Sequence, residues 1–195
     1  MDETLKLPLL GSRNYLHGTT LFEALEKRFV DGSAISLKLS QMMLTDTVRV
    51  QEFDPAVELG RAYSATVTWM ADGSRRGLGV SPLLTSDQID RAVYDEESIV
   101  AKADFQDHSV TIAQPSGYSL VKTIVALHKA LLFRLLAPAR SGQWLFTRFD
   151  LEAVPASWLP LSISHGQGSN LAAVASEVAF DGRPGGRVMF SWWDR

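Results

Sequence analysis

The chain has 195 residues, with 46% hydrophobic and 21% charged residues and a formal net charge of -3. This length is sufficient for one large domain or for two small fused units that bury a core. The charge gives no basic surface for nucleic acid, and the absence of cysteine excludes disulfides, thiolate catalysis and Cys-based metal sites. The first residues, MDETLK, are too acidic and polar for a signal peptide, so a cytoplasmic protein is expected.

The first half of the chain is expected to hold one helix followed by antiparallel strands. Apolar residues at helical spacing predict a helix over Leu21–Val30, and Thr20 and Glu23 have the spacing of a capping box at its start. Alternating apolar and polar residues then predict strands within 35–53 and over 63–70 and 77–84. Asp72-Gly73, between the last two, is a strong hairpin signal.

The second half repeats this order. After an acidic, polar segment over 85–98, strands are expected within 99–113 and over 143–151, 171–180 and 187–193, with Asp181-Gly182 as a second hairpin turn. Between the first two of these strand regions lies a helix, from Leu120 to Ala137, that is apolar on nearly every side. Such a helix is buried in a protein core or in a membrane. Its four basic or titratable side chains would be costly in lipid, so we expect a core helix wrapped by a sheet and no membrane span.

The two halves also match in detail. Both place a glycine, then a hydroxyl residue two positions later and a leucine at the start of the helix, and both end in an Asp-Gly hairpin. Two matches in the same order indicate duplication of an ancestral unit. The matched helix starts are Gly18, Thr20 and Leu21 in the first half and Gly117, Ser119 and Leu120 in the second.

A buried helix followed by several antiparallel strands resembles the hotdog fold, and two such units in one chain resemble the double hotdog proteins. The resemblance rests on element order and patterning, without a family-specific motif. It implies an α+β fold in which antiparallel sheets wrap two long central helices. The expected organisation is a first half over 1–86, an acidic linker over 87–98 and a second half over 99–195, together forming one compact domain.

The resemblance also implies a chemistry. Hotdog proteins typically act on acyl thioesters of coenzyme A or acyl carrier protein, as thioesterases or 3-hydroxyacyl dehydratases, and they use no cofactor. The N-terminus of a central helix directs backbone N–H groups at the thioester carbonyl, and a carboxylate or histidine transfers the proton. The resemblance places the catalytic residues at His17 and Glu23, and the oxyanion-binding or substrate-binding residues at Gly18, Thr19, Gly117 and Tyr118.

Alternatives stay open for each of these residues. His17 can equally be a turn residue whose ring bonds locally, and Glu23 can serve only the capping box. The second half carries Ser116 where the first carries His17, and its helix has no acidic residue. This asymmetry favours hydrolysis over dehydration, and it also leaves room for a non-catalytic acyl-binding protein. A homo-oligomer formed through sheet edges is a further possibility, and the spacing of the four histidines, with His128 in a helix and His108 and His165 in polar loops, predicts no metal site.

Overall fold

The computed structural model describes residues 2–57, 62–85, 88–136, 142–166 and 173–194. Its contacts divide the chain into two compact units, which are described separately below. The first unit comprises Met1–Tyr94 with Leu151–Val154, and the second comprises Asp95–Asp150 with Pro155–Arg195.

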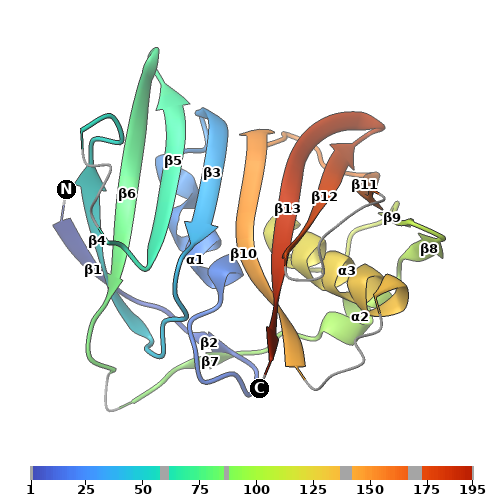
Figure 1. The fold of residues 1–195 in the computed structure, drawn as a ribbon, viewed down its shortest axis with the longest axis horizontal. Coiled ribbons are helices and arrows are strands. Elements are labelled where there is room, and N and C mark those ends of the chain that lie inside the picture. The colour runs from blue at the N-terminus through green and yellow to red at the C-terminus, as the bar shows by residue number, and fades with distance from the viewer. Residues whose placement is uncertain (1, 58–61, 86–87, 137–141, 167–172, 195) are drawn as a thin grey trace. The chain divides into compact units, whose positions relative to one another are not determined.

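The first unit is an antiparallel sheet with a short helix, α1, behind it in the view of Figure 1. The strand order is β1-β4-β6-β5-β3. A separate two-residue parallel pair, β2 with β7, joins the start of the unit to its end. The elements are β1 (Asp2–Lys6), β2 (Leu9–Leu10), α1 (Gly18–Leu25), the 3-10 turn η1 (Glu26–Arg28), β3 (Ser33–Leu39), β4 (Thr47–Phe53), β5 (Ala65–Ala71), β6 (Ser74–Pro82) and β7 (Arg91–Ala92).

The predicted hairpin between β5 and β6 is confirmed. Asp72 and Gly73 both have positive φ, 51° and 74°, which is the backbone of a type I′ turn and matches the twist of the flanking strands. The second predicted hairpin, at Asp181-Gly182, has the same geometry, with φ of 50° and 72°. In both cases a two-residue signal fixes the strand register locally.

The first helix is not the long central helix that was expected. A helix was predicted over Leu21–Val30, whereas α1 begins at Gly18, has 8 residues and tightens into η1. After the tightened turn, the centroid of the Phe29 ring lies 5.0 Å from that of Phe22 and 6.2 Å from that of Trp69 in β5. The chain then passes so close to Trp69 that a Cβ on Gly32 would lie 2.6 Å from its ring. Packing against β5 therefore ends the helix early, and the prediction of two long central helices is wrong.

The edge strand β1 was not predicted, because its sequence is polar. It pairs with β4, and ion pairs reinforce its position. Arg49 donates to Asp2 at 2.8 Å, and Arg28 donates to Glu3 at 3.0 Å.

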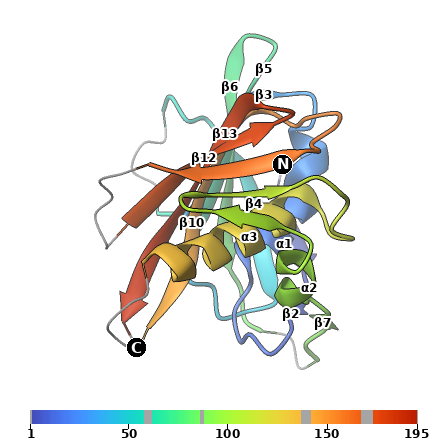
Figure 2. The same cartoon turned by 90° about the vertical axis from the view of Figure 1, so that its right-hand side faces the viewer.

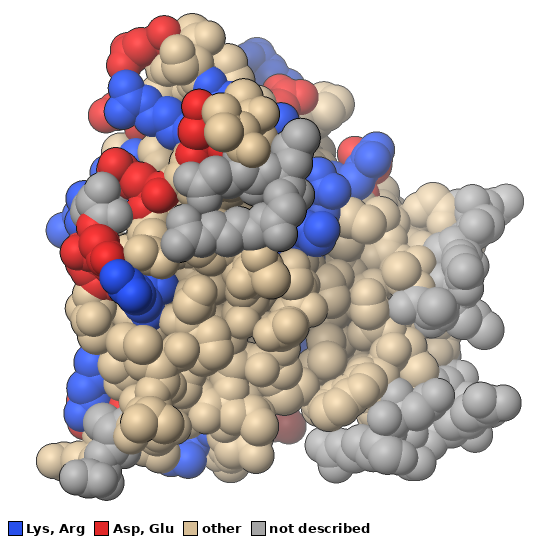
Figure 3. Space-filling model, turned by 60° about the vertical axis from the view of Figure 1, so that its left-hand side comes forward, with Lys and Arg blue, Asp and Glu red and all other residues tan. Residues whose placement is uncertain are grey.

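In the face shown in Figure 3, charges of both signs gather in the upper part and along the left margin, and a broad area beside them carries none.

The second unit contains the one long helix of the described chain, α3, against a larger antiparallel sheet. Its strand order is β10-β13-β12-β11-β9-β8. The elements are α2 (Glu96–Val100), β8 (Asp104–Gln106), β9 (Ser109–Ile112), α3 (Leu120–Leu135), β10 (Gly142–Ala153), β11 (Leu161–His165), β12 (Ala173–Phe180) and β13 (Arg183–Asp194).

The prediction that α3 is a core helix is confirmed. It contacts β9, β11 and β13, and it lies against the sheet of its unit in Figure 2. Its basic side chains find partners: Lys129 donates to Glu96 of α2 at 2.8 Å, and the Arg134 guanidinium lies 3.4 Å from the centre of the Phe105 ring. Among the described helices, none combines the length and the apolar character needed to cross a membrane.

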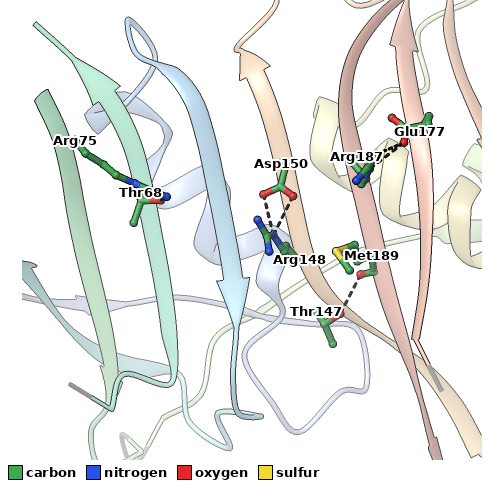
Figure 4. A network of polar contacts seen from close by, with 8 residues as sticks. All are labelled: Thr68, Arg75, Thr147, Arg148, Asp150, Glu177, Arg187 and Met189. Carbon is green, nitrogen blue, oxygen red and sulfur yellow. Dashed lines mark hydrogen bonds and ion pairs between the residues drawn. The ribbon is translucent and has the colours of Figure 1, made fainter. Parts of the chain in front are cut away.

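The solvent-facing side of the second sheet carries paired charges, as Figure 4 shows. Arg187 of β13 donates to Glu177 of β12 at 2.8 Å, and Arg148 donates to Asp150 within β10 at 2.9 Å. Along β12 the residues on either side of Glu177 are buried, so the strand alternates between a polar and an apolar face. The core of the unit thus lies between this sheet and α3.

Two local predictions in the second half are wrong. Residues 99 and 100, expected at the start of a strand, belong to α2, because Asp95 caps that helix by accepting the Ser98 N–H at 3.1 Å and Ile99 is fully buried. The expected linker over 87–98 stays a prediction; the described part of that segment contains β7 and the first residues of α2. His165, placed by the sequence in an exposed loop, is a buried residue at the end of β11.

In both units one helix is followed by strands that include an Asp-Gly hairpin, as predicted, but β11 was not predicted and the two sheets differ. In the first unit the strand after the helix, β3, lies next to β5. In the second unit the corresponding strand, β10, lies next to β13, and the Thr147 hydroxyl donates to the Met189 carbonyl across that pair at 3.2 Å. The strand after the helix thus lies next to the first strand of the Asp-Gly hairpin in the first unit and next to the second strand of that hairpin in the second unit.

We expect Gly79→Ala to destabilise the first unit. A Cβ at position 79 in β6 would overlap the ring of Tyr63, which is buried and lies 5.2 Å from the Phe53 ring. Overpacking of this kind costs about 1–3 kcal/mol. Urea unfolding measures the loss. Gly166→Ala is the matched control, since a Cβ there meets nothing within 4 Å; equal stability of the two variants would contradict the packing described.

Candidate functional site

The N-terminus of α1 is organised by His17, which caps the helix. Its backbone is extended (φ -79°, ψ 139°), and its Nδ1 atom accepts the Thr19 N–H at 3.4 Å and lies 2.8 Å from the Thr19 hydroxyl. The helix therefore starts at Gly18. Thr20, the predicted cap, is the third helical residue, so the predicted capping box with Glu23 is wrong.

This capping bond bears on the tautomer of the neutral imidazole, that is, on which ring nitrogen carries the proton. When Nδ1 accepts the Thr19 N–H, the proton of a neutral imidazole is on Nε2. The ring is buried and has two aromatic neighbours, with its centroid 6.1 Å from Tyr15 and 6.2 Å from Tyr94. In the tautomer that accepts this bond, His17 presents an N–H donor rather than a lone pair at Nε2.

The segment leading into His17 is held by residues distant in the sequence. Arg91 of β7 donates to the carbonyls of Gly11 and Arg13, at 2.7 and 2.9 Å. The Arg13 guanidinium in turn lies 5.5 Å from the Tyr94 ring centre. Sequence reasoning did not find Arg91 or Tyr94, because no local pattern connects them with His17.

The first turn of α1 offers backbone donors next to the imidazole. The helix begins with the Leu21 N–H bonding to the His17 carbonyl, so the N–H groups of Gly18, Thr19 and Thr20 precede the first helical bond. All three residues are buried. Such groups, at the positive end of a helix dipole, stabilise an oxygen that carries negative charge. His17, Gly18 and Thr19 therefore lie together at the start of α1, and their role in a reaction stays a prediction.

Two carboxylates follow on the same helix. Glu23 is half-buried and lies five residues after Gly18, about 7–8 Å along the axis at 1.5 Å per residue. Glu26, in η1, is also half-buried. Burial raises the pKa of the Glu26 carboxyl, and the negative charge of Glu23 raises it further.

Gly117 and Tyr118 lie in the second unit, where their described contacts are structural. Gly117 has φ of +92°, a conformation that favours glycine. The Tyr118 hydroxyl accepts the Asp95 N–H at 3.0 Å, and the Tyr118 N–H donates to the Ser116 hydroxyl at 3.0 Å. Helix α3 starts only at Leu120, with Ser119 as its cap, so Gly18 and Gly117 are not equivalent in structure. A role for Gly117 and Tyr118 in substrate binding stays a prediction.

A second polar cluster, which the sequence did not predict as a group, is buried in the second unit. His128 Nε2 of α3 lies 2.8 Å from the Ser176 hydroxyl, and His165 Nδ1 lies 3.3 Å from the same oxygen. Burial lowers the pKa of His128 to about 3, with a smaller contribution from the charge of His165. Burial, and then the charge of His108, lower the pKa of His165. The cluster is therefore neutral at physiological pH.

Comparison with known proteins identifies the fold. No protein-family model matches this sequence, and no curated protein matches it. The structure is similar to a protein of Thermobifida fusca YX provisionally described as a thioesterase II, with 10% identity and a TM-score of 0.51 over 98% of this chain and 92% of that one.

Two further solved structures are similar at lower scores. The erythromycin dehydratase has 14% identity and a TM-score of 0.47, over 97% of this chain and 89% of that chain. A protein of Lactobacillus plantarum provisionally described as an oleoyl thioesterase has 9% identity and a TM-score of 0.45, over 99% and 94% of the two chains. The likeness to the Thermobifida protein shows the fold alone: this chain has a double hotdog fold.

We expect stability to fall in acid through His128. An unfolded histidine has a pKa of 6.5 and folded His128 a pKa of about 3, so between these values the unfolded chain binds one proton more. The free energy of unfolding then falls by about 1.4 kcal/mol for each pH unit as the pH is lowered. His128→Leu should remove this contribution while Ser176 keeps its contact with His165.

Urea unfolding of both proteins at several pH values between about 7 and 4, followed by tryptophan fluorescence, measures the difference in slope. Other groups titrate in both proteins alike, so only the difference reports on His128. Identical slopes would show that His128 binds a proton as readily in the folded as in the unfolded chain and would contradict the lowered pKa.

Proposed function

We propose that this protein binds acyl thioesters of coenzyme A or of an acyl carrier protein and hydrolyses them at the N-terminus of α1. The observation that supports this most directly is the buried imidazole of His17 beside the N–H groups of the first helical turn. The double hotdog fold, and the description of a similar structure as a thioesterase II, agree with this class of substrate.

In the proposed reaction the thioester carbonyl oxygen accepts hydrogen bonds from the first turn of α1. Water attacks the carbonyl carbon, and the oxygen becomes negatively charged in the tetrahedral intermediate. The helix N-terminus stabilises that charge more than it stabilises the ground state. When the intermediate collapses, the carbon–sulfur bond breaks and the products are a carboxylic acid and a thiol.

Glu23 and His17 are the side chains proposed to interact with the protons of the reaction. Glu23 is the proposed base, because helical side chains lean toward the N-terminus and its carboxylate can reach a water at the first turn. His17, with its proton on Nε2, is proposed to donate a hydrogen bond to the developing negative charge, and Glu23 then passes the proton that it took from water to the departing sulfur. This assignment differs from the general-base role expected for His17 from the sequence, since the capping bond occupies Nδ1.

The wild-type protein is expected to release free thiol from at least one member of a panel of short-, medium- and long-chain acyl-CoAs and acyl carrier proteins. A thiol reagent detects the product. Binding without turnover would identify a non-catalytic acyl-binding protein, and neither binding nor turnover with any member of the panel would refute the proposal.

His17→Asn separates the chemical role of the residue from its structural role. Asparagine is a good N-cap and can accept the Thr19 N–H, so we expect stability close to wild type, whereas His17→Ala should lose about 1 kcal/mol. Because asparagine has no imidazole, kcat/KM of His17→Asn should fall by about 100-fold or more. His108→Asn, at an exposed turn position, is the control and should be unaffected. Unchanged kcat/KM in His17→Asn would exclude His17 from the reaction.

A further inference from the structure

Thr20 carries a buried hydroxyl that has no hydrogen-bond partner in the described part of the chain. It is the third residue of α1 and is 6% exposed, and its Oγ1 atom contacts neither a donor nor an acceptor there. A buried polar group that is left unpaired destabilises the folded state, so each such group requires an explanation.

The other buried threonines show how unusual this is. Four threonines are buried among the described residues, and three of them are hydrogen-bonded. The Thr45 hydroxyl bonds to both the N–H and the carbonyl of Thr47, and the Thr123 hydroxyl of α3 donates to the Ser119 carbonyl. The Thr19 hydroxyl lies 2.8 Å from His17 Nδ1. Thr20 does not bond to the His17 carbonyl three residues earlier either.

The position of the hydroxyl suggests what it binds. Side chains of a helix lean toward its N-terminus, so the Thr20 side chain is expected to extend toward the end of α1, where the N–H groups of Gly18 and Thr20 are used neither by the helix nor by its cap. A hydroxyl there can donate to the same oxygen as those N–H groups. The helix end and the unpaired hydroxyl are two separate observations, and both favour a ligand with an oxygen acceptor.

We propose that the Thr20 hydroxyl donates a hydrogen bond to the carbonyl oxygen of the bound acyl thioester, in addition to the backbone donors of α1. This inference rests on the function proposed above and adds to it a side chain that binds the reacting group. The hydroxyl is unpaired in the free protein because its partner is the ligand. It follows that Thr20 lowers the stability of the free protein and strengthens the binding of substrate.

Thr20→Val tests the proposal, because valine has nearly the same shape and no donor. We expect kcat/KM to fall on the order of 10- to 100-fold, as for loss of one oxyanion donor, and Thr20→Ser to retain most of the activity. The free variant should be as stable as wild type or more stable, since an unpaired hydroxyl has been removed. Thr45→Val is the matched control: it should lose stability, because its hydroxyl is bonded, and keep kcat/KM.

Binding of two coenzyme A analogues locates the interaction. One is a ketone in which CH2 replaces the thioester sulfur and the carbonyl is kept, and the other is an S-alkyl thioether without a carbonyl. Thr20→Val should weaken binding of the ketone on the order of 10-fold and leave binding of the thioether unchanged. Equal losses for both analogues would place Thr20 in general packing of the ligand and overturn the proposal.

The two proposals fail in different ways. If the wild type neither binds nor hydrolyses any acyl thioester, the proposed function is wrong and the carbonyl assignment of Thr20 falls with it. If the wild type is active and Thr20→Val matches it in kcat/KM and in ketone binding, only the inference about Thr20 is wrong. If Thr20→Val is destabilised as much as Thr45→Val, the hydroxyl has a structural partner and the inference is also wrong.

Discussion

The bond between the His17 ring and Thr19 determines where α1 begins, and the candidate site depends on that starting point. A helix capped at Thr20 would have its unused N–H groups at Leu21 and beyond, on the apolar stripe. Capping at His17 uses the Thr19 N–H and moves the unused groups to Gly18 and Thr20, next to the imidazole. The same bond directs the neutral ring's proton to Nε2. One capping interaction thus places the donors and sets the chemical character of the histidine.

The two units differ in how the polar groups at the start of their helices are hydrogen-bonded, and this difference bears on function. In the second unit the Ser116 hydroxyl bonds with Thr123 at 2.7 Å, and Lys102 donates to the Ser116 carbonyl at 2.8 Å. Ser119 caps the helix. Polar groups around the start of α3 are therefore satisfied by the chain itself. In the first unit Thr20 is left unpaired beside the helix end. Of the two helix starts, the one in the first unit has the unmet hydrogen-bonding capacity that a ligand can use.

Sequence reasoning succeeded where the determining interactions are local. The Asp-Gly hairpins, the burial of α3 and the order of helix and strands follow from turn chemistry and periodicity within short windows. It failed where partners distant in the sequence decide the outcome. The polar strand β1 forms by pairing with β4, which is distant in the sequence, and α1 ends before Val30 because the chain at Gly32 passes close to Trp69. His165 was placed in a loop since its partner, Ser176, is in another strand.

The same distinction applies to the site. His17, Gly18 and Thr19 could be selected from the sequence because they are adjacent in the chain. Thr20 was selected for the wrong reason: a threonine three residues before a glutamate fits a capping box, and only the position of the true cap shows that its hydroxyl is unused. A capping threonine would have its hydrogen bond satisfied within the helix and would have nothing to offer a ligand. The shift of the helix start by three residues therefore turns a structural side chain into one with a free donor, and for this reason the start of α1 matters more to function than its length.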